Sequence, residues 1–258
     1  MKSIVLKMFL LIIGLYIVIS YYLYATQEQK IFNSKRVEKI EPKIAKKIEF
    51  KSSDGVVLEG GLVENKKGAP LVLYFGGNGS NVIWFLDMVA SKIKDFNFIA
   101  FNYPGYGNSL GKPSEETILK YAQEIYKKYN PSIVVGRSLG SAVAIYVASK
   151  NPVKGLVLIT PIDSIVNIAK ARYPFLLVDY LVKHKFEANR WAKDIKAKVA
   201  VILVENENIV PKKSIENILN ELKDKIVYKA TIKEANHIDI YSYEQTIKEL
   251  EKALKAVK

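Results

Sequence analysis

The hydrophobic pattern divides the chain into an apolar first segment and a long stretch that alternates strands with helices. Two segments of alternating apolar and polar residues, Lys47–Lys51 and Val56–Val63, flank Ser53-Asp54-Gly55 and predict an antiparallel hairpin. Further apolar runs as long as a buried strand occur at 71–75, 96–101, 133–135, 153–159, 199–204 and 226–228. Helical periodicity is found at about 81–93, 114–129, 139–150, 211–223 and 239–257. Because continuous apolar runs suit strands buried on both faces, we predict an α/β domain with a mostly parallel sheet and helices on both sides.

The first 25 residues are predicted to form a transmembrane anchor. No charge interrupts the stretch from Met8 to Tyr24, and Lys7 can snorkel, so the apolar length reaches about 20 residues, enough to cross a bilayer. Tyrosines crowd its far end, as in an interfacial aromatic belt. A cleaved signal peptide is the alternative, but the site Leu23-Tyr24-Ala25 lacks the small residue that cleavage needs at its first position. A buried soluble helix would normally carry polar residues on one face.

Residues 26–45 are predicted to be a basic juxtamembrane linker that leads into a domain at 46–258. The positive residues of the linker are Lys30, Lys35, Arg36, Lys39 and Lys43. They fit either a solvated linker or a contact with anionic lipid headgroups. Positive charges lie on both sides of the span, so the side of the membrane that holds the domain stays open. The lysine-, isoleucine- and asparagine-rich composition suggests a bacterial source, and we expect a single-pass protein of an inner membrane.

Composition and charge narrow the chemistry. The 258 residues include no cysteine, which excludes disulfides, iron–sulfur clusters, thiolate zinc sites and a cysteine nucleophile. Only two histidines are present, so we expect no histidine-rich metal site and no cofactor. The formal net charge of +13 would suit anionic membranes or nucleic acid. Only four of the 39 basic residues are arginine, however, and arginine dominates base and phosphate recognition, so nucleic acid is not an expected partner.

One stretch interrupts the alternation of strands and helices. Between Ile159 and Val199 the sequence has helical pieces and many apolar side chains but no predicted strand. An apolar insertion after a central strand fits a lid over a pocket, at about 161–196, and it equally fits an ordinary long crossover connection.

The strongest chemical motif is Gly136-Arg137-Ser138-Leu139-Gly140, a GxSxG sequence. It directly follows a predicted strand and opens a predicted helix, which is the setting of a nucleophile elbow. The sharp turn strains the serine backbone and requires very small neighbours two residues away on each side. Ser138 is therefore the predicted nucleophile, and the helix N-terminus beside it would favour a developing oxyanion.

A serine nucleophile needs a base, and the base needs an acid that orients it. His237 follows the last predicted strand and fits the Ser–acid–His chain order, whereas His184 lies in the insertion, on what we interpret as a basic, solvated face. The acid is expected in the loop after the next-to-last strand, where both Glu207 and Glu205 are available. Asp163, at the end of an earlier strand, is a third candidate.

An oxyanion hole requires two backbone N–H groups that converge on one point. One should come from Leu139, the residue after the nucleophile, and the other from the glycine-rich loop Gly76–Ser80. Glycines let this backbone approach an acyl group closely. A phosphate-binding loop is the other interpretation, but the stretch lacks the lysine of a P-loop and the spacing of a dinucleotide fingerprint.

Taken in order, these motifs resemble an α/β-hydrolase, specifically the membrane-anchored, Bem-like group of hydrolase-domain proteins. The matching residues are the anchor followed by 29–32, then 74–79, 102–114, 136–140, 160–161, 209–211 and 236–237. Two residues depart from the pattern of the group: Gly76 stands where a histidine is usual, and Glu207 where an aspartate is usual. We expect the first change to loosen the oxyanion loop and the second to hold the histidine less firmly, which affects rate more than reaction type.

The resemblance implies a serine hydrolase of esters or thioesters, with acyl-lipid or acyl-protein substrates. In that mechanism Ser138 attacks the acyl carbonyl, His237 takes its proton and Glu207 orients the imidazole. The N–H groups of Asn78 and Leu139 hold the oxyanion, and water releases the acid. The alternatives are a membrane binding or scaffold protein with weak or no catalysis, and a serine peptidase on the same fold. The acyl substrate, the leaving group and the oligomeric state stay open.

Overall fold

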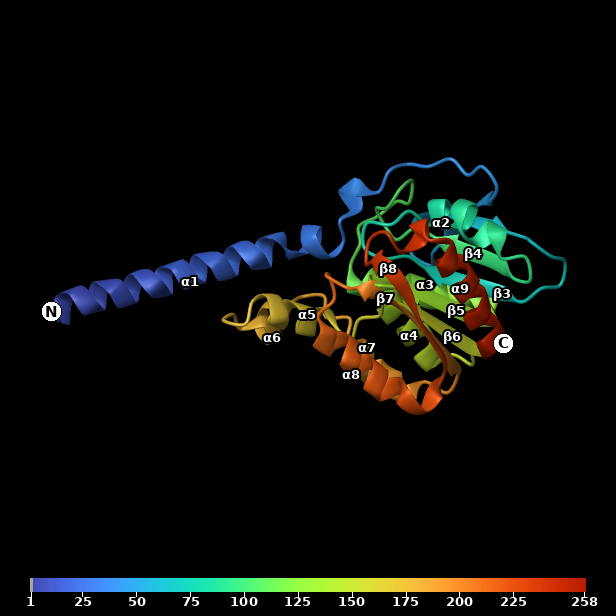
Figure 1. Ribbon diagram of the computed structural model, residues 1–258. Helices are drawn as coiled ribbons and strands as arrows, with labels where there is room; N and C mark the ends of the chain where they lie inside the picture. The colour runs from blue at the N-terminus through green and yellow to red at the C-terminus, as the bar shows by residue number, and fades with distance from the viewer. Residues whose placement is uncertain (1) are drawn as a thin grey trace.

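The computed structural model describes residues 2–258 and contains one eight-stranded sheet (Figure 1). The strands are β1 Lys46–Lys51, β2 Val57–Val63, β3 Leu71–Phe75, β4 Asn97–Phe101, β5 Ile133–Arg137, β6 Gly155–Ile159, β7 Lys198–Asn206 and β8 Ile226–Asn236. They lie in the order β1-β2-β4-β3-β5-β6-β7-β8. β1 and β2 form the predicted antiparallel hairpin, β2 is antiparallel to β4, and every remaining pair is parallel. The prediction of a mostly parallel α/β sheet is confirmed.

Helices cover both faces of the sheet. They are α2 Val82–Met88, α3 Glu115–Tyr129, α4 Leu139–Lys150, α8 Lys212–Leu222 and α9 Glu244–Val257. Helices α3, α4 and α8 enclose one hydrophobic core, and α2 and α9 enclose a second. Neighbouring residues of a strand point to opposite faces, so Leu73 lies in the first core and Tyr74 in the second.

Strand β8 covers Ile226–Asn236 and is longer than the predicted strand, which covered only 226–228. The residues of β8 alternate between exposed and more buried positions, since it is the edge strand. It therefore lacks the continuous apolar run by which the inner strands were predicted. The final helix begins at Glu244 rather than near residue 239, after a 3-10 turn at Ile240–Ser242. The longer strand carries the chain directly to His237.

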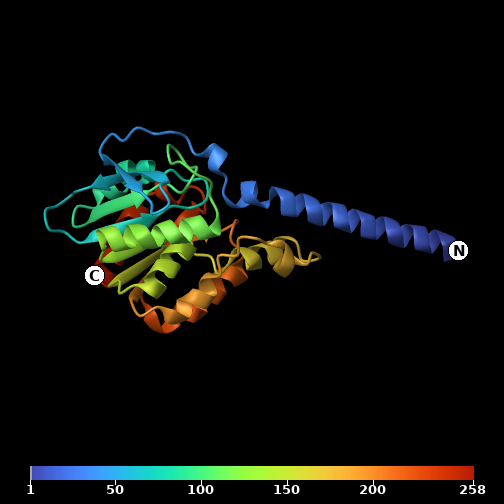
Figure 2. The same cartoon turned by 180° about the vertical axis from the view of Figure 1, so that it is seen from behind.

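Helix α1 (Lys2–Ile31) is unbroken and projects away from the domain (Figures 1 and 2). It is long and apolar enough to cross a membrane. The helix continues beyond residue 25, the predicted end of the anchor. The chain then turns through a short 3-10 helix at Ser34–Arg36 and packs Phe32 and Val37 into the first core. The division into anchor, linker and domain stays a prediction, with α1 running through the first part of the linker.

The insertion, residues 161–196, contains short helices and a loop that lies beside α1. Its α-helices are α5 Ile165–Arg172, α6 Val178–Leu181 and α7 Ala188–Trp191. Helices α5 and α6 share a small third core with α1, and both views place them next to its C-terminal half (Figures 1 and 2). The chain returns to the domain where the Glu115 carboxylate accepts the N–H groups of Lys185 and Phe186. The insertion is thus fixed to the domain at its end and to α1 through α5 and α6.

Candidate active site

Ser138 lies on the sharp turn between β5 and α4. Its φ of 51° and ψ of −119° form a strained conformation that costs about 1–3 kcal/mol for a residue with a side chain. Close backbone packing holds this turn. A Cβ atom at Gly136 would collide with the carbonyl of Gly140, and one at Gly140 would collide with the carbonyls of Phe75 and Gly76. Both motif glycines are therefore required by space, and the turn lies at the carboxyl edge of the sheet.

Hydrogen bonds join three of the predicted residues. His237 Nε2 lies 2.9 Å from Ser138 Oγ, and His237 Nδ1 lies 2.8 Å from Glu207 Oε2. Glu207 directly follows β7 and His237 directly follows β8, so parallel strands carry both residues to the edge that holds Ser138. The imidazole is buried. This is the arrangement of a nucleophile, a base and an acid that orients the base.

Both carboxylate oxygens of Glu207 are held. Oε2 faces His237, and Oε1 accepts the N–H groups of Ile209 and Val210 at 2.9 Å each. Burial raises the pKa of Glu207, but the hydrogen bonds from His237 and from these two N–H groups lower it by more. The net pKa lies below the ordinary value for a glutamate, so the side chain is ionised at neutral pH. An ionised Glu207 favours the tautomer of His237 that carries its proton on Nδ1.

The two alternative acids have other partners. Glu205 accepts the N–H of Glu234 at 2.8 Å, across the β7–β8 pair. Asp163 is completely buried at the start of the insertion. Its hydrogen-bond donors are the Ser164 N–H and the side chains of Asn167, Ser214 and Asn217. Asp163 therefore ties the insertion to α8, and Glu207 is the carboxylate that the structure brings to His237.

The prediction that His184 lies on a solvated face is wrong. Its side chain is 14% exposed, its ring packs edge-on against Phe32 with centroids 4.8 Å apart, and Nδ1 accepts the N–H of Glu115 at 3.2 Å. Burial lowers the pKa of His184, and Glu28 offsets this effect only in part. In residues 182–186, lysines alternate with valine, histidine and phenylalanine. This alternation could have placed the histidine on the inner side together with the two apolar residues.

The glycine-rich loop after β3 passes close to Ser138. A Cβ atom at Gly77 would lie 3.4 Å from the Ser138 Cβ, so the two backbone segments are in contact. Asn78 and Leu139 border the same cavity as Ser138. Leu139 is the first residue of α4, and N–H groups in the first turn of a helix have no acceptor within it. The loop and the helix start therefore meet beside the nucleophile, as an oxyanion hole requires.

Two tyrosines with no predicted role support this loop. Tyr103 donates its hydroxyl hydrogen to the carbonyl of Gly76 at 2.9 Å, and Tyr106 donates to Asn78 Oδ1 at 3.3 Å. Both rings are buried and pack edge-on against each other. Tyr103 thus holds Gly76, the residue that was expected to loosen the oxyanion loop.

A buried carboxylate anchors the segment that carries these tyrosines. Glu59 on β2 accepts hydrogen bonds from Asn102 Nδ2 at 2.9 Å, and from the Asn108 N–H and side chain at 3.0 and 2.6 Å. A buried charge is costly unless hydrogen bonds replace its water, and these donors do so. In the sequence, the one sign of this anchoring role was that Glu59 is a single acid inside an otherwise apolar strand.

Arg137, the residue before Ser138, fixes the segment that carries His237. Its Nη2 donates to the carbonyls of His237 and Ile238 at 2.5 and 3.3 Å. The guanidinium lies over the ring of Tyr241, 5.1 Å from the centroid. These contacts join positions 100 residues apart, so no local pattern predicted them.

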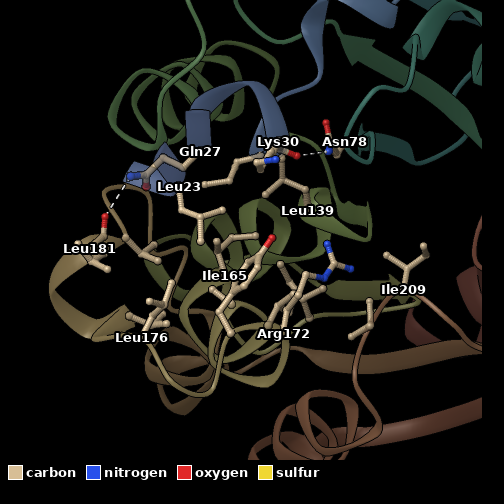
Figure 3. Close-up of a pocket in the computed structure, with 18 of the residues that line it drawn as sticks. Leu23, Gln27, Lys30, Asn78, Leu139, Ile165, Arg172, Leu176, Leu181 and Ile209 are labelled. Carbon is tan, nitrogen blue, oxygen red and sulfur yellow. Dashed lines mark hydrogen bonds between the residues drawn. The ribbon is translucent and has the colours of Figure 1, made fainter. Parts of the chain in front are cut away.

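An apolar cavity of about 230 Å³ opens beside Ser138 (Figure 3). Its walls come from α1, from the insertion and from the loop after β7. They include Leu23 and Gln27 of α1, Ile165 and Leu176 of the insertion, and Ile209. An apolar chamber beside a serine suits the hydrocarbon part of an acyl substrate. Within residues 2–258, no group of three histidine or acidic side chains is placed to hold a metal ion.

Known proteins share both sequence and fold with this chain. Residues 69–183 match the sequence profile of the family described as alpha/beta hydrolase fold. The chain is similar to the alpha/beta hydrolase domain-containing protein WAV2 of Arabidopsis thaliana, with 33% identity over 49% of this chain and 46% of that protein. It is also similar to protein bem46 of Schizosaccharomyces pombe, with 32% identity over 50% and 48%. An uncharacterized membrane protein of Saccharomyces cerevisiae is 30% identical over 40% of each chain. The chain spans about half the length of these relatives or less.

Solved structures extend the likeness over most of the chain. An alpha-beta hydrolase from Vibrio vulnificus has a TM-score of 0.69 and 16% identity, covering 90% of this chain and 92% of that one. The Pyrococcus furiosus esterase Pf2001 has a TM-score of 0.60 and 20% identity, covering 82% and 91%. At these identities the likeness concerns the fold alone. The predicted fold class and the predicted resemblance to Bem-like hydrolase-domain proteins are confirmed.

Proposed function

We propose that this chain, which has the α/β-hydrolase fold, is a membrane-anchored serine hydrolase that cleaves carboxylic esters or thioesters. The observation that carries the proposal is the hydrogen-bonded series Ser138–His237–Glu207 at the wall of an apolar cavity. The match of residues 69–183 to the alpha/beta hydrolase fold family supports a hydrolytic reaction.

The reaction has two halves. Ser138 Oγ attacks the acyl carbonyl, and His237 Nε2 takes the hydroxyl proton and passes it to the departing alcohol or thiol. The carbon–oxygen or carbon–sulfur bond breaks, which leaves the acyl group on Ser138. Water then attacks this acyl-enzyme, His237 takes a proton from the water, and the carboxylic acid leaves as Ser138 regains its proton. Glu207 stabilises the imidazolium formed in each half.

The N–H groups of Asn78 and Leu139 stabilise the oxyanion in both halves. Their role is supported by the position of both residues at the cavity beside Ser138. A pre-arranged donor needs little reorganisation during the reaction, and removing one costs about 10²–10³-fold in turnover. Tyr103 and Tyr106, through Gly76 and Asn78, would keep the loop in place.

The membrane anchor in this proposal is α1. Its 30 residues extend about 45 Å at ~1.5 Å per residue, more than the ~30 Å thickness of a hydrocarbon core. The Saccharomyces cerevisiae relative is named a membrane protein, which supports the same location. The catalytic domain would then lie at the membrane surface, attached through the end of α1.

Labelling with a fluorophosphonate probe tests the proposed nucleophile. The full chain in detergent should be labelled, and Ser138→Ala should not, because the probe reacts with an activated serine. Ser53→Ala is the matched control, since Ser53 is exposed between β1 and β2 and should leave labelling unchanged. Hydrolysis of p-nitrophenyl butyrate should follow the same pattern.

The rival proposal is a binding or scaffold protein of the hydrolase fold. A wild-type protein with a native circular dichroism spectrum, no labelling and no cleavage of p-nitrophenyl butyrate would favour the rival. Cleavage of esters together with peptides of similar size would favour a peptidase on the same residues.

A further inference from the structure

The membrane helix itself forms part of the cavity wall. Five residues from its last turns face the chamber: Leu23, Tyr24, Gln27, Lys30 and Ile31. The opposite wall consists of insertion residues such as Ile165 and Leu176 (Figure 3). The cavity next to Ser138 is therefore enclosed between α1 and the insertion.

Hydrogen bonds fix α1 to both the insertion and the catalytic loop. Gln27 is buried, donates to the Leu181 carbonyl at 3.0 Å and accepts the Lys183 N–H at 2.8 Å. The Asn78 side chain donates to the Lys30 carbonyl at 3.1 Å (Figure 3). A single loop thus touches the nucleophile region and the end of the membrane helix.

The insertion tip, residues 173–182, lies alongside the middle of α1. The Leu177 N–H donates to the hydroxyl of Tyr16 at 3.3 Å, and Leu176 packs in the small core that includes Tyr16 and Leu23. Eight residues separate Tyr16 from Tyr24 along the helix, which corresponds to about 12 Å at ~1.5 Å per residue. If α1 crosses a bilayer with Tyr24 at the interface, the tip must lie below that interface.

The outer surface of the insertion tip is suited to that depth. Phe175 and Leu177 are each 62% exposed and Tyr180 is 86% exposed. The one acid of the tip, Asp179, is paired with Lys170 at 2.7 Å. Three large apolar or aromatic side chains on one short segment are costly in water but favourable at the boundary between headgroups and acyl chains.

Basic groups lie at the base of the tip. Lys170 and Arg172 end α5, and Lys183 follows α6 with its ammonium 4.2 Å from the Tyr24 ring. Cations beside an interfacial tyrosine fit the level of anionic headgroups. The exposed apolar side chains of the tip and the basic side chains next to it therefore suit the same position of the membrane surface as Tyr24 of α1 does.

We propose that the insertion tip enters the leaflet that surrounds the C-terminal half of α1, and that the acyl chain of the substrate passes from that leaflet directly into the cavity between the tip and α1. The substrate class is an ester or thioester whose acyl chain is embedded in the membrane. The substrate assignment rests on the proposed function, whereas the insertion of the tip does not. Hydrocarbon in the leaflet and hydrocarbon in the cavity are similar media, so the acyl chain transfers without exposure to water.

Depth-dependent quenching tests the insertion of the tip. Because the chain has no cysteine, Leu177→Cys or Tyr180→Cys can each carry a single fluorophore in the full chain. The labelled protein is reconstituted in bilayers of phosphatidylcholine with some anionic phosphatidylglycerol. Val227→Cys is the control, because Val227 is half-exposed at the amino end of β8, away from the site. Doxyl-labelled lipid should quench both tip positions at least about threefold more than the control. Equal quenching at Leu177 and Val227 would overturn the proposal.

A comparison of two esters tests the route of entry. The triple variant Phe175→Ser, Leu177→Ser and Tyr180→Ser should lower cleavage of bilayer-embedded 4-methylumbelliferyl palmitate, relative to dissolved p-nitrophenyl butyrate, by about tenfold. The double variant Met88→Ser and Val227→Ser removes exposed apolar groups elsewhere and should leave the ratio unchanged. An unchanged ratio in the triple variant would overturn the entry route.

The two experiments separate the two proposals. If no ester is cleaved and no fluorophosphonate reacts, the proposed function fails while the quenching result still decides whether the tip is inserted. If esters are cleaved but the tip is not quenched by lipid, the proposed function stands and the membrane route fails.

Discussion

The surroundings of Ser138 and the insertion tip are built in contrasting ways. Around Ser138, hydrogen bonds join residues of β2 and β5 and of the segments that follow β3, β4, β7 and β8, above two large cores. The insertion tip rests on a small core of three buried side chains, Val166, Leu176 and Val178, with partly buried neighbours from the insertion and from α1. Regions with few buried contacts open at lower free energy than the core of a domain. The fold itself therefore fixes the catalytic geometry, whereas the order of the cavity wall depends on α1 and its surroundings.

Among the residues that support Ser138, the largest effect is expected from Glu207→Ala. Without its acid, His237 loses the partner that fixes its tautomer, and turnover of p-nitrophenyl butyrate should fall about 10³- to 10⁴-fold. Glu205→Ala is the matched control, because Glu205 bonds to the Glu234 N–H instead. A Glu207→Ala enzyme with more than a tenth of wild-type turnover would mean that the observed hydrogen bond is not used.

A smaller effect is expected from Tyr103→Phe, which removes the hydrogen bond to the Gly76 carbonyl. Losing about 1 kcal/mol of support for the oxyanion loop should lower kcat about fivefold with little change in KM. Tyr121→Phe removes a comparable tyrosine hydrogen bond, to Asp54, far from the site and should leave kcat unchanged. Equal kcat values for the two variants would show that the loop does not need this support.

On the other side of the comparison, Gln27→Leu should affect the membrane-embedded substrate more than the dissolved one. It breaks the two contacts of Gln27 with the insertion, so KM for the bilayer-embedded palmitate ester should rise about threefold more than KM for p-nitrophenyl butyrate. Gln29→Leu is the control, on an exposed position of the same helix. A parallel loss with both esters would mean that α1 also supports the catalytic geometry.

The smallest effect concerns stability and pH. The folded-state pKa of Glu207 lies below its ordinary value, so ionised Glu207 stabilises the fold above about pH 4.5, the ordinary range. This contribution is lost as pH falls through the folded-state pKa. The difference in unfolding free energy between wild type and Glu207→Gln should therefore be constant near neutral pH and shrink below about pH 4.5. Urea unfolding in detergent, followed by tryptophan fluorescence, measures it, and a difference that grows on acidification would contradict the sign.

The mostly parallel sheet and the three central residues were predictable because each follows a local rule. The GxSxG spacing requires a strand before Ser138 and a helix after it. Once that turn is assigned, the base and acid must follow later parallel strands, which leaves His237 and few choices for the acid. The structure brings Glu207 to His237 and assigns Asp163 to the attachment of the insertion.

The supporting contacts were not predictable because they join distant parts of the chain. Glu59 holds Asn102 across 43 residues, and Gln27 holds Leu181 across 154. No periodic pattern encodes such pairs, since each depends on how the elements pack. The participation of α1 in the cavity was hidden for the same reason: an apolar helix is predicted equally well whether lipid or a substrate chamber faces it.

Because α1 runs unbroken from the proposed membrane span into the cavity wall, it sets a fixed distance between the bilayer and the catalytic domain. A flexible tether would let a catalytic domain sample many heights above a bilayer. Here Phe32, the residue after the helix, packs in the domain core, and the helix is tied to the loop beside Ser138 through Lys30 and Asn78. If α1 spans a bilayer as proposed, Ser138 therefore stays at one distance from the midplane, and lateral diffusion in two dimensions delivers scissile bonds to that level. Selection among lipids would then depend on where along the membrane normal each ester group sits.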